Sequence, residues 1–175
     1  MIHNTTLPGL FTVSLPTNFE DFRGSFLELY KKDTYKNEIQ QATGFDIDFV
    51  QDNASTSTKH VLRGFHGDSV TWKLITCLKG RIYFVVLNYD KESPYYLKHQ
   101  GFTLSDKNGL QLLIPPNSAG AQLVMSDYAI LHYKQSQYYN RASQFTVLWN
   151  DERLGVHWPI NNPILSERDT HGDNI

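Results

Sequence analysis

The sequence predicts an all-β protein, a double-sheet jelly roll or closed barrel with one or two short helices. The first observation is composition, since three Trp, ten Tyr and ten Phe beside only two Met favour β-strands. The second is spacing, because short apolar segments recur about every 8–12 residues, as in sandwiches and barrels. Gly and Pro punctuate the chain without linkers or repeats, so we expect one domain over residues 1–175.

The strand signals run along most of the chain. Residues 25–30 alternate in polarity directly after a turn at residues 21–24. Residues 81–89 (RIYFVVLNY) predict a buried strand, because Val, Tyr and Phe dominate them. The other predicted strands are residues 61–65, 74–78, 95–104, 110–114, 121–125, 129–134 and 144–149.

Two short segments predict helix. Residues 35–41 form the first, with Asp33 or Thr34 as its cap and Gly44 as its end. Residues 166–169 predict a second, single turn. The barrel therefore dominates the architecture, and its mouth is a natural site for a small ligand.

The charge balance and the single cysteine exclude several classes of protein. The net charge of −2 lacks the basic excess that a general nucleic-acid binder needs. Cys77 is the only cysteine, which excludes an internal disulfide and fits a reducing compartment. The sequence shows neither a signal-peptide pattern nor an apolar run approaching the ~20 residues of a membrane helix. We therefore expect a cytoplasmic protein without nucleic-acid or membrane partners.

Seven histidines are candidate metal ligands, but their spacing disfavours a metal. A metal-binding barrel of this kind usually joins two or three imidazoles, often through a His-x-His pair. No two of the histidines are separated by a single residue: His3, His60, His66, His99, His132, His157 and His171. We therefore expect no metal centre.

His66 is the most prominent candidate for chemistry. It follows an apolar strand and lies between two glycines, in the sequence RGFHGD at residues 63–68. A strand end places a side chain at the mouth of a barrel, and imidazole titrates near neutral pH. His66 is therefore either a general base or a hydrogen-bonded structural histidine.

Three further side chains each leave two interpretations open. Lys73 enters an apolar strand, where it either meets an anion inside the barrel or keeps its ammonium group in water. Tyr133 points inward if Leu131 does, and a buried phenol needs a partner or serves as an acid. Asp169 either orients a histidine or is a surface acid at a helix end.

Short motifs follow one another in a recognisable order. They begin with FEDFRG at residues 19–24, QDNASTS at 51–57, VLRGFH at 61–66 and KL at 73–74. They continue with IP at 114–115, YK at 133–134, YY at 138–139, WND at 149–151, WP at 158–159 and LSERD at 165–169. No single motif is specific, but the ordered set resembles the dTDP-4-dehydrorhamnose 3,5-epimerase family.

The resemblance implies a cupin-type jelly roll, a homodimer with exchanged N-terminal strands, and no cofactor or metal. The implied substrate is a nucleotide-diphosphate sugar, a 4-keto-6-deoxy sugar used in surface polysaccharide synthesis. A base removes a proton beside the ketone, an enolate forms, and an acid returns a proton to the opposite face. By the resemblance, His66 coupled to Asp169 is the base, Tyr133 is the acid, and Lys73 stabilises the enolate.

The resemblance also implies the substrate contacts. Arg63 suits a pyrophosphate, because a guanidinium bonds oxygens in pairs, and Tyr139 matches the aromatic that stacks on the base. The remaining positions are Gln51 and Asn53, which hydrogen-bond, and Arg23 and Glu28, which reach the nucleotide from the partner subunit.

Three positions depart from the family pattern. Gly120 stands where the family has a second histidine, Phe84 stands where it has an aspartate, and residues 66–68 read HGD instead of HYQ. These changes indicate a different sugar or a different regiochemistry. The combination of RGFHGD at residues 63–68, PPN at 115–117 and WNDER at 149–153 is similar to a branch that acts on GDP-linked 4-keto heptoses. A glycine at position 120 would leave room for the extra carbon of such a sugar.

Three other functions remain as alternatives. A ketoisomerase of the same fold would move the keto group between C3 and C4, but we expect it to lack the pair of Tyr133 and Asp169. A non-catalytic sugar-nucleotide binding barrel fits the loss of the second histidine, but not the retention of His66 and Lys73. A metal-dependent cupin oxygenase would be detected by a metal assay.

Overall fold

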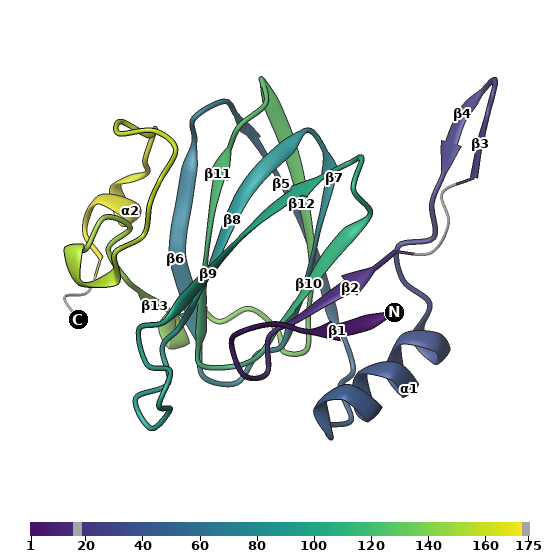
Figure 1. Ribbon diagram of the computed structural model, residues 1–175, viewed down its shortest axis with the longest axis horizontal. Helices are drawn as coiled ribbons and strands as arrows, with labels where there is room; N and C mark the ends of the chain where they lie inside the picture. Colours follow the sequence, from purple (N-terminus) through teal and green to yellow (C-terminus); the bar gives the residue numbers. More distant parts are fainter. Residues whose placement is uncertain (16–18, 173–175) are drawn as a thin grey trace.

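Two antiparallel β-sheets face each other in the computed structural model, which describes residues 1–15 and 19–172 (Figure 1). The first sheet has the order β1-β2-β10-β7-β12-β5 and the second β13-β6-β11-β8-β9. The strands of the first are β1 (Ile2–Asn4), β2 (Phe11–Ser14), β5 (Gln51–Thr58), β7 (Lys73–Lys79), β10 (Leu110–Ile114) and β12 (Tyr128–Gln135). Those of the second are β6 (Leu62–Asp68), β8 (Arg81–Asn88), β9 (His99–Ser105), β11 (Ser118–Val124) and β13 (Phe145–Thr146). The predicted all-β jelly roll is confirmed.

A two-stranded hairpin projects away from this body (Figure 1). It consists of β3 (Phe19–Asp21) and β4 (Gly24–Phe26). The predicted strand over residues 25–30 is therefore wrong beyond Phe26, because residues 27–31 form the connection to helix α1 (Lys32–Thr43).

The longer apolar strands were predicted, whereas the short strands β1 and β2 and the polar strand β5 were not. The prediction for residues 110–114 agrees with β10 at both ends. The predicted strand over residues 95–104 begins only at His99, because residues 91–97 form turns in which Leu97 takes a φ of 66°. The sequence prediction missed β5 altogether, since its eight residues (QDNASTST) contain no large apolar side chain.

The helices begin and end for local reasons. Gly44 ends α1 in the left-handed conformation, as predicted. The predicted cap is wrong: Lys31 precedes the helix without a side-chain cap, and Asp33 lies in the first turn, where the helix dipole favours a carboxylate. The predicted turn at residues 166–169 is confirmed as α2 (Glu167–Thr170), capped by the Ser166 side chain.

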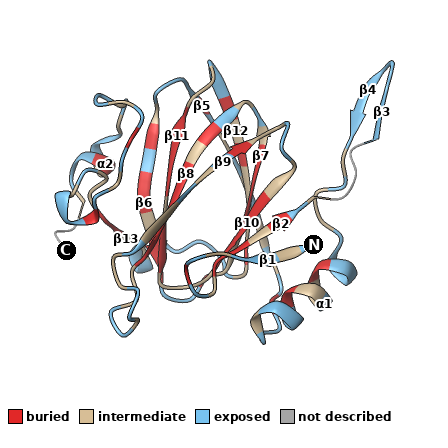
Figure 2. Cartoon of the chain, in the orientation of Figure 1, coloured by how far each residue is buried: buried red, intermediate tan, exposed pale blue. Residues whose placement is uncertain are grey.

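Three apolar clusters hold these layers together. Figure 2 shows the buried residues concentrated on the strands of the two sheets. One cluster fills part of the space between the sheets, and a second joins α1 to the outer face of the first sheet through Tyr35 and Ile39. The third lies on the outer face of the second sheet, where Trp158 and Leu154 of the C-terminal segment cover it. This segment then runs beside β6, since Ile164 forms a parallel bridge with Val61. No helix among the described residues is long and apolar enough to cross a membrane.

Candidate active site

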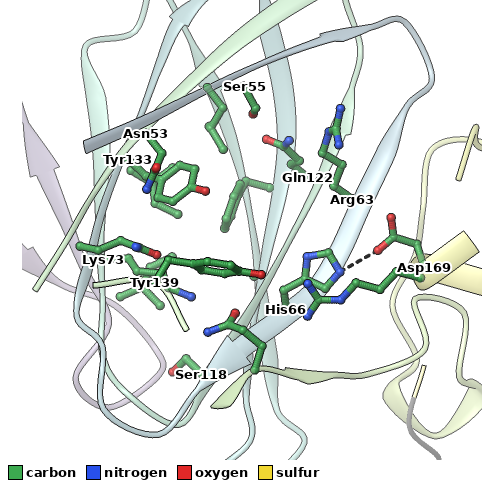
Figure 3. A pocket seen from close by; sticks show the side chains of 18 of the residues that line it. Asn53, Ser55, Arg63, His66, Lys73, Ser118, Gln122, Tyr133, Tyr139 and Asp169 are labelled. Carbon is green, nitrogen blue, oxygen red and sulfur yellow. Dashed lines mark ion pairs between the residues drawn. The ribbon is translucent and has the colours of Figure 1, made fainter. Parts of the chain in front are cut away.

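A cavity of about 680 Å³ lies between the two sheets, with polar side chains directed into it (Figure 3). It brings together residues from β5, β6, β7 and β12 with the loop after β12 and the C-terminal helix. Eight of the ten predicted site residues line it: Gln51, Asn53, Arg63, His66, Lys73, Tyr133, Tyr139 and Asp169.

His66 and Asp169 form a close pair at one side of this cavity. Nε2 of His66 lies 2.7 Å from Oδ1 of Asp169, although out of line for a good hydrogen bond (Figure 3). The carboxylate is buried and also accepts hydrogen bonds from the Ser166 hydroxyl at 2.6 Å and the Gly64 N–H at 3.2 Å. Burial alone would raise the pKa of Asp169, but the contacts with His66 and Ser166 hold it below its usual value.

The structure also shows how the chain brings this pair together. The C-terminal segment is fastened to the start of β6, where Leu62 N–H donates to the Ile164 carbonyl and Ile164 N–H donates to the His60 carbonyl. The Ser166 side chain then starts α2, and Asp169 follows three residues later. Of the two interpretations of Asp169, the structure therefore supports the one in which it contacts a histidine.

Lys73 lies inside the cavity and not at a solvent-exposed edge of its strand. Its side chain is 16% exposed, and its Nζ lies 3.7 Å from Oδ2 of Asp68. Burial lowers the pKa of Lys73, while the Asp68 charge opposes that shift. The ammonium group is therefore held in the cavity beside a buried counter-charge.

Tyr133 faces the cavity from β12 of the first sheet, opposite His66 on β6 of the second sheet. Leu131, Tyr133 and Gln135 alternate along β12 and all line the cavity, as the predicted strand face requires. Burial raises the pKa of Tyr133, and the neighbouring Tyr139 adds to this effect. The phenol therefore keeps its proton near neutral pH and is available as a donor.

The other predicted contacts are linked to one another. Gln51 donates from Nε2 to Oδ1 of Asn53 at 3.0 Å, and its Oε1 accepts from the Tyr139 N–H at 2.8 Å. Strand β5 thereby holds the loop that carries Tyr139. Arg63 donates from Nε to the Ser57 hydroxyl at 2.9 Å, which fixes part of the guanidinium at the cavity wall.

Arg23 and Glu28 are not in this cavity. Arg23 lies between the strands of the projecting hairpin, where its guanidinium pairs with the carboxylate of Asp21. Its side chain is 77% exposed, and Glu28 is also exposed in the connection to α1. These two residues do not contribute to the cavity of their own chain.

Several lining residues were missed from the sequence. Ser55 and Gln122 could have been found by extending the inner-face alternation along β5 and β11. Others come from segments too short to carry a periodic signal: Arg141 in the 3-10 turn after β12, Gln144 directly before β13, and Arg168 in α2. Arg168 is oriented by a hydrogen bond from its Nε to the Thr146 hydroxyl at 2.9 Å.

The extra room expected at Gly120 is absent. Gly120 pairs with His66 across β11 and β6, and the Phe84 ring leans over it from β8. A Cβ at position 120 would lie 2.9 Å from Cζ of Phe84. The expectation that glycine makes space for an extra carbon is therefore wrong, because the ring already occupies that space. The residue at position 120 and the ring of Phe84 therefore share one space beside His66, so the size of one limits the size of the other.

Replacing Gly120 by alanine is therefore expected to destabilise the fold by about 1–3 kcal/mol through overpacking. The double variant Gly120→Ala/Phe84→Leu should recover much of this loss, because the smaller side chain leaves room for the new methyl group. Urea unfolding of the parent and the two variants measures both effects. An unchanged stability of Gly120→Ala would contradict the close packing of this pair.

Within the part of the chain that the structure describes, no group of three or more His, Cys, Asp or Glu side chains is placed to hold a metal ion.

Comparisons with known proteins agree with this geometry. The model of the dTDP-4-dehydrorhamnose 3,5-epimerase family matches residues 4–175. The dTDP-4-dehydrorhamnose 3,5-epimerase of Salmonella typhimurium is 38% identical over 173 residues, which cover 97% of this chain and 92% of the relative.

Solved structures show the same similarity. The dTDP-6-deoxy-D-glucose-3,5-epimerase of Legionella pneumophila, solved with dTDP-4-keto-L-rhamnose, matches with a TM-score of 0.89 and 32% identity over 98% of this chain and 90% of that one. A 3'-monoepimerase from Streptomyces bikiniensis, solved with dTDP-quinovose, matches with a TM-score of 0.88 and 26% identity over 97% and 85%.

Fold, cavity and relatives together define a jelly-roll epimerase of the cupin type. The chain belongs to the dTDP-4-dehydrorhamnose 3,5-epimerase family.

Proposed function

We propose that this protein inverts C3, C5 or both in a dTDP-linked 4-keto-6-deoxy sugar. The observation that carries the proposal is the cavity itself, in which the His66–Asp169 pair, Lys73 and Tyr133 converge from different strands. Relatives in the same family act on dTDP-linked sugars, by their names and by the ligands of their structures.

The chemistry follows from the acidity of the protons beside a ketone. Nε2 of His66 is buried against Asp169, so Nδ1 is the ring nitrogen that accepts the proton. The electrons of the broken C–H bond form an enolate, whose oxygen is stabilised by the positive charge of Lys73. Tyr133 then donates its phenolic proton to the carbon from the opposite face. The phenolate regains a proton from solvent, and His66 releases the one it took.

The nucleotide-diphosphate part requires cations and a flat surface. Arg63, Arg141 and Arg168 line the cavity and supply paired donors for phosphate oxygens. Tyr139 is half exposed, which leaves its ring available for stacking on a base.

The GDP-linked 4-keto heptose of the related branch is the comparison substrate. The sequence motifs of that branch are present in this chain. However, the Phe84 ring occupies the space beside Gly120 that was expected to hold the extra carbon of the heptose. We therefore propose the six-carbon dTDP-sugar as the preferred substrate. The retained proton-transfer residues do not favour the ketoisomerase or the non-catalytic barrel.

The test is conversion of substrate by the purified protein. A dehydratase generates the dTDP- or GDP-linked 4-keto-6-deoxy sugar in place, and proton NMR follows the ring couplings, which change when C3 or C5 inverts. We expect inversion with the dTDP-sugar. Unchanged couplings with it would contradict the proposal, and faster conversion of the GDP-heptose would contradict the substrate preference.

We also propose that the enzyme is a homodimer in which the N-terminal strands are exchanged. The projecting hairpin exposes three aromatic rings, Phe19, Phe22 and Phe26, with exposed fractions of 67%, 98% and 71%. Such a patch on a small element favours burial against another protein surface. A second copy would cover it and would bring Arg23 towards the partner's cavity.

Replacing Phe22 by glutamate is expected to shift the protein from dimer to monomer, because the charge would be buried in the interface. Light scattering after gel filtration measures the mass, and Tyr95→Ser, another exposed aromatic in the loop before β9, is the matched control. A dimer that persists in Phe22→Glu would contradict the role of the hairpin.

Mixing Arg23→Ala with His66→Ala tests the exchange of residues between subunits. If Arg23 serves the partner's cavity, mixed dimers contain one intact site, and about one quarter of all sites regain activity. No recovery in confirmed mixed dimers would place Arg23 outside the partner's cavity.

We further propose that the reaction takes place in the cytoplasm and precedes the use of the sugar in surface polysaccharide. The single cysteine in the sequence supports a reducing compartment.

A further inference from the structure

Asp68 is a buried carboxylate without a role in the chemistry proposed above. It ends β6, two residues after His66, and is 3% exposed. Oδ1 accepts hydrogen bonds from the N–H groups of Thr71, at 2.7 Å, and Val70, at 3.0 Å. One oxygen is therefore used by the turn that leads into β7.

The second oxygen of Asp68 is directed towards two side chains of the cavity. Oδ2 accepts a hydrogen bond from Nε2 of Gln144 at 2.8 Å and lies 3.7 Å from Nζ of Lys73. Both Gln144 and Lys73 line the cavity, whereas Asp68 does not. The Asp68 carboxylate thus contacts the side chains of Gln144 and Lys73 from outside the cavity that they line.

The charge of Asp68 is significant because Lys73 is poorly exposed. A buried ammonium group loses its hydration and tends to release its proton unless a negative charge lies nearby. Arg168 acts on Lys73 in the opposite sense, as a like charge. The remaining titratable groups around the cavity are Arg63, His66, Tyr133, Tyr139, Arg141, Glu167 and Asp169.

We propose that Asp68 is a positioning residue, which keeps Lys73 a cation inside the cavity and fixes the Gln144 carboxamide beside it. The catalytic consequence rests on the proposed function, in which the Lys73 charge stabilises the enolate. The ion pair itself does not depend on that function.

The variant Asp68→Asn tests the proposal, since it keeps the shape and an oxygen for the turn but removes the charge. Carbon NMR of the lysine Cε atoms, assigned with Lys73→Arg, measures the titration of Lys73. We expect its pKa to fall by about one unit in Asp68→Asn. Asp106→Asn, which removes the carboxylate paired with exposed Lys79, is the control and should leave Lys73 unchanged.

The pH profile of kcat in Asp68→Asn should shift in the same direction as the pKa of Lys73. Lys73 acts as a cation, so a lower pKa moves the alkaline limb of kcat to lower pH, with about a tenfold loss at its alkaline end. An unchanged Lys73 titration would overturn the proposal. A shifted titration with an unshifted pH profile would overturn its catalytic part.

Failure of the proposed function has a separate signature. In that case the Lys73 titration shifts in Asp68→Asn, but the parent protein catalyses no proton exchange at any pH. If Asp68→Asn does not fold, Lys73→Met tests the pair from the other side. The pKa of the Asp68 carboxyl, read from its Cγ signal, should then rise, and an unchanged value would overturn the coupling.

Discussion

Replacing His66 by alanine is expected to abolish proton exchange between substrate and solvent, with a loss of about 10²–10⁴-fold in kcat. Its ring nitrogen is the base in the proposed reaction, and no second histidine lines the cavity among the described residues. Position 120, where the family carries one, is glycine and is covered by Phe84. No neighbouring imidazole can therefore take over.

The affinity for the nucleotide should remain close to that of the parent. Binding of the nucleotide depends on cationic side chains and on stacking, and does not need the catalytic base His66. Calorimetric titration with dTDP measures the affinity. His157→Ala is the control, since this exposed histidine does not line the cavity. Exchange at the parent rate in His66→Ala would remove His66 as the base.

Replacing Tyr133 by phenylalanine is expected to separate the two halves of the reaction. The variant keeps the ring that packs between Ile75 and Leu131 but loses the phenolic proton. Proton removal by His66 should continue, while delivery to the opposite face should fall by about 10²-fold or more. Solvent deuterium would then enter the substrate with retention of configuration.

NMR of deuterium uptake together with product stereochemistry measures both halves in one sample. The matched control is Tyr128→Phe, which removes an exposed phenol from the same strand, outside the cavity. If Tyr133→Phe inverts the sugar as fast as the parent, another group must be the donor.

The parts of the fold that could be predicted from the sequence are those buried on apolar faces. Strands such as β8 and β10 could be predicted because they are rich in Val, Leu and Ile, and the burial of these side chains drives sheet packing. Strand β5 could not be predicted in this way, because its inner face lines a polar cavity instead of a core. The polar residues that let β5 line the cavity also remove the apolar alternation by which a strand is recognised in a sequence.

The candidate site divides along similar lines. His66, Lys73 and Tyr133 could be selected because they lie at the ends or faces of predicted strands. The alternatives for Lys73 and Asp169 could be decided only in three dimensions, since burial of the first and the contact of the second with His66 depend on long-range packing. Asp68 and Phe84 appeared only as departures from a pattern, and register and ring placement show what they contact.

The most direct test of the central claim is proton NMR of the parent enzyme in deuterium oxide with the dTDP-linked 4-keto-6-deoxy sugar. The proposed mechanism predicts deuterium at C3, C5 or both, together with inversion at the labelled carbon, because His66 and Tyr133 exchange their protons with solvent. A substrate that binds but gains no deuterium at either carbon would contradict it and would identify the cavity as a binding site only.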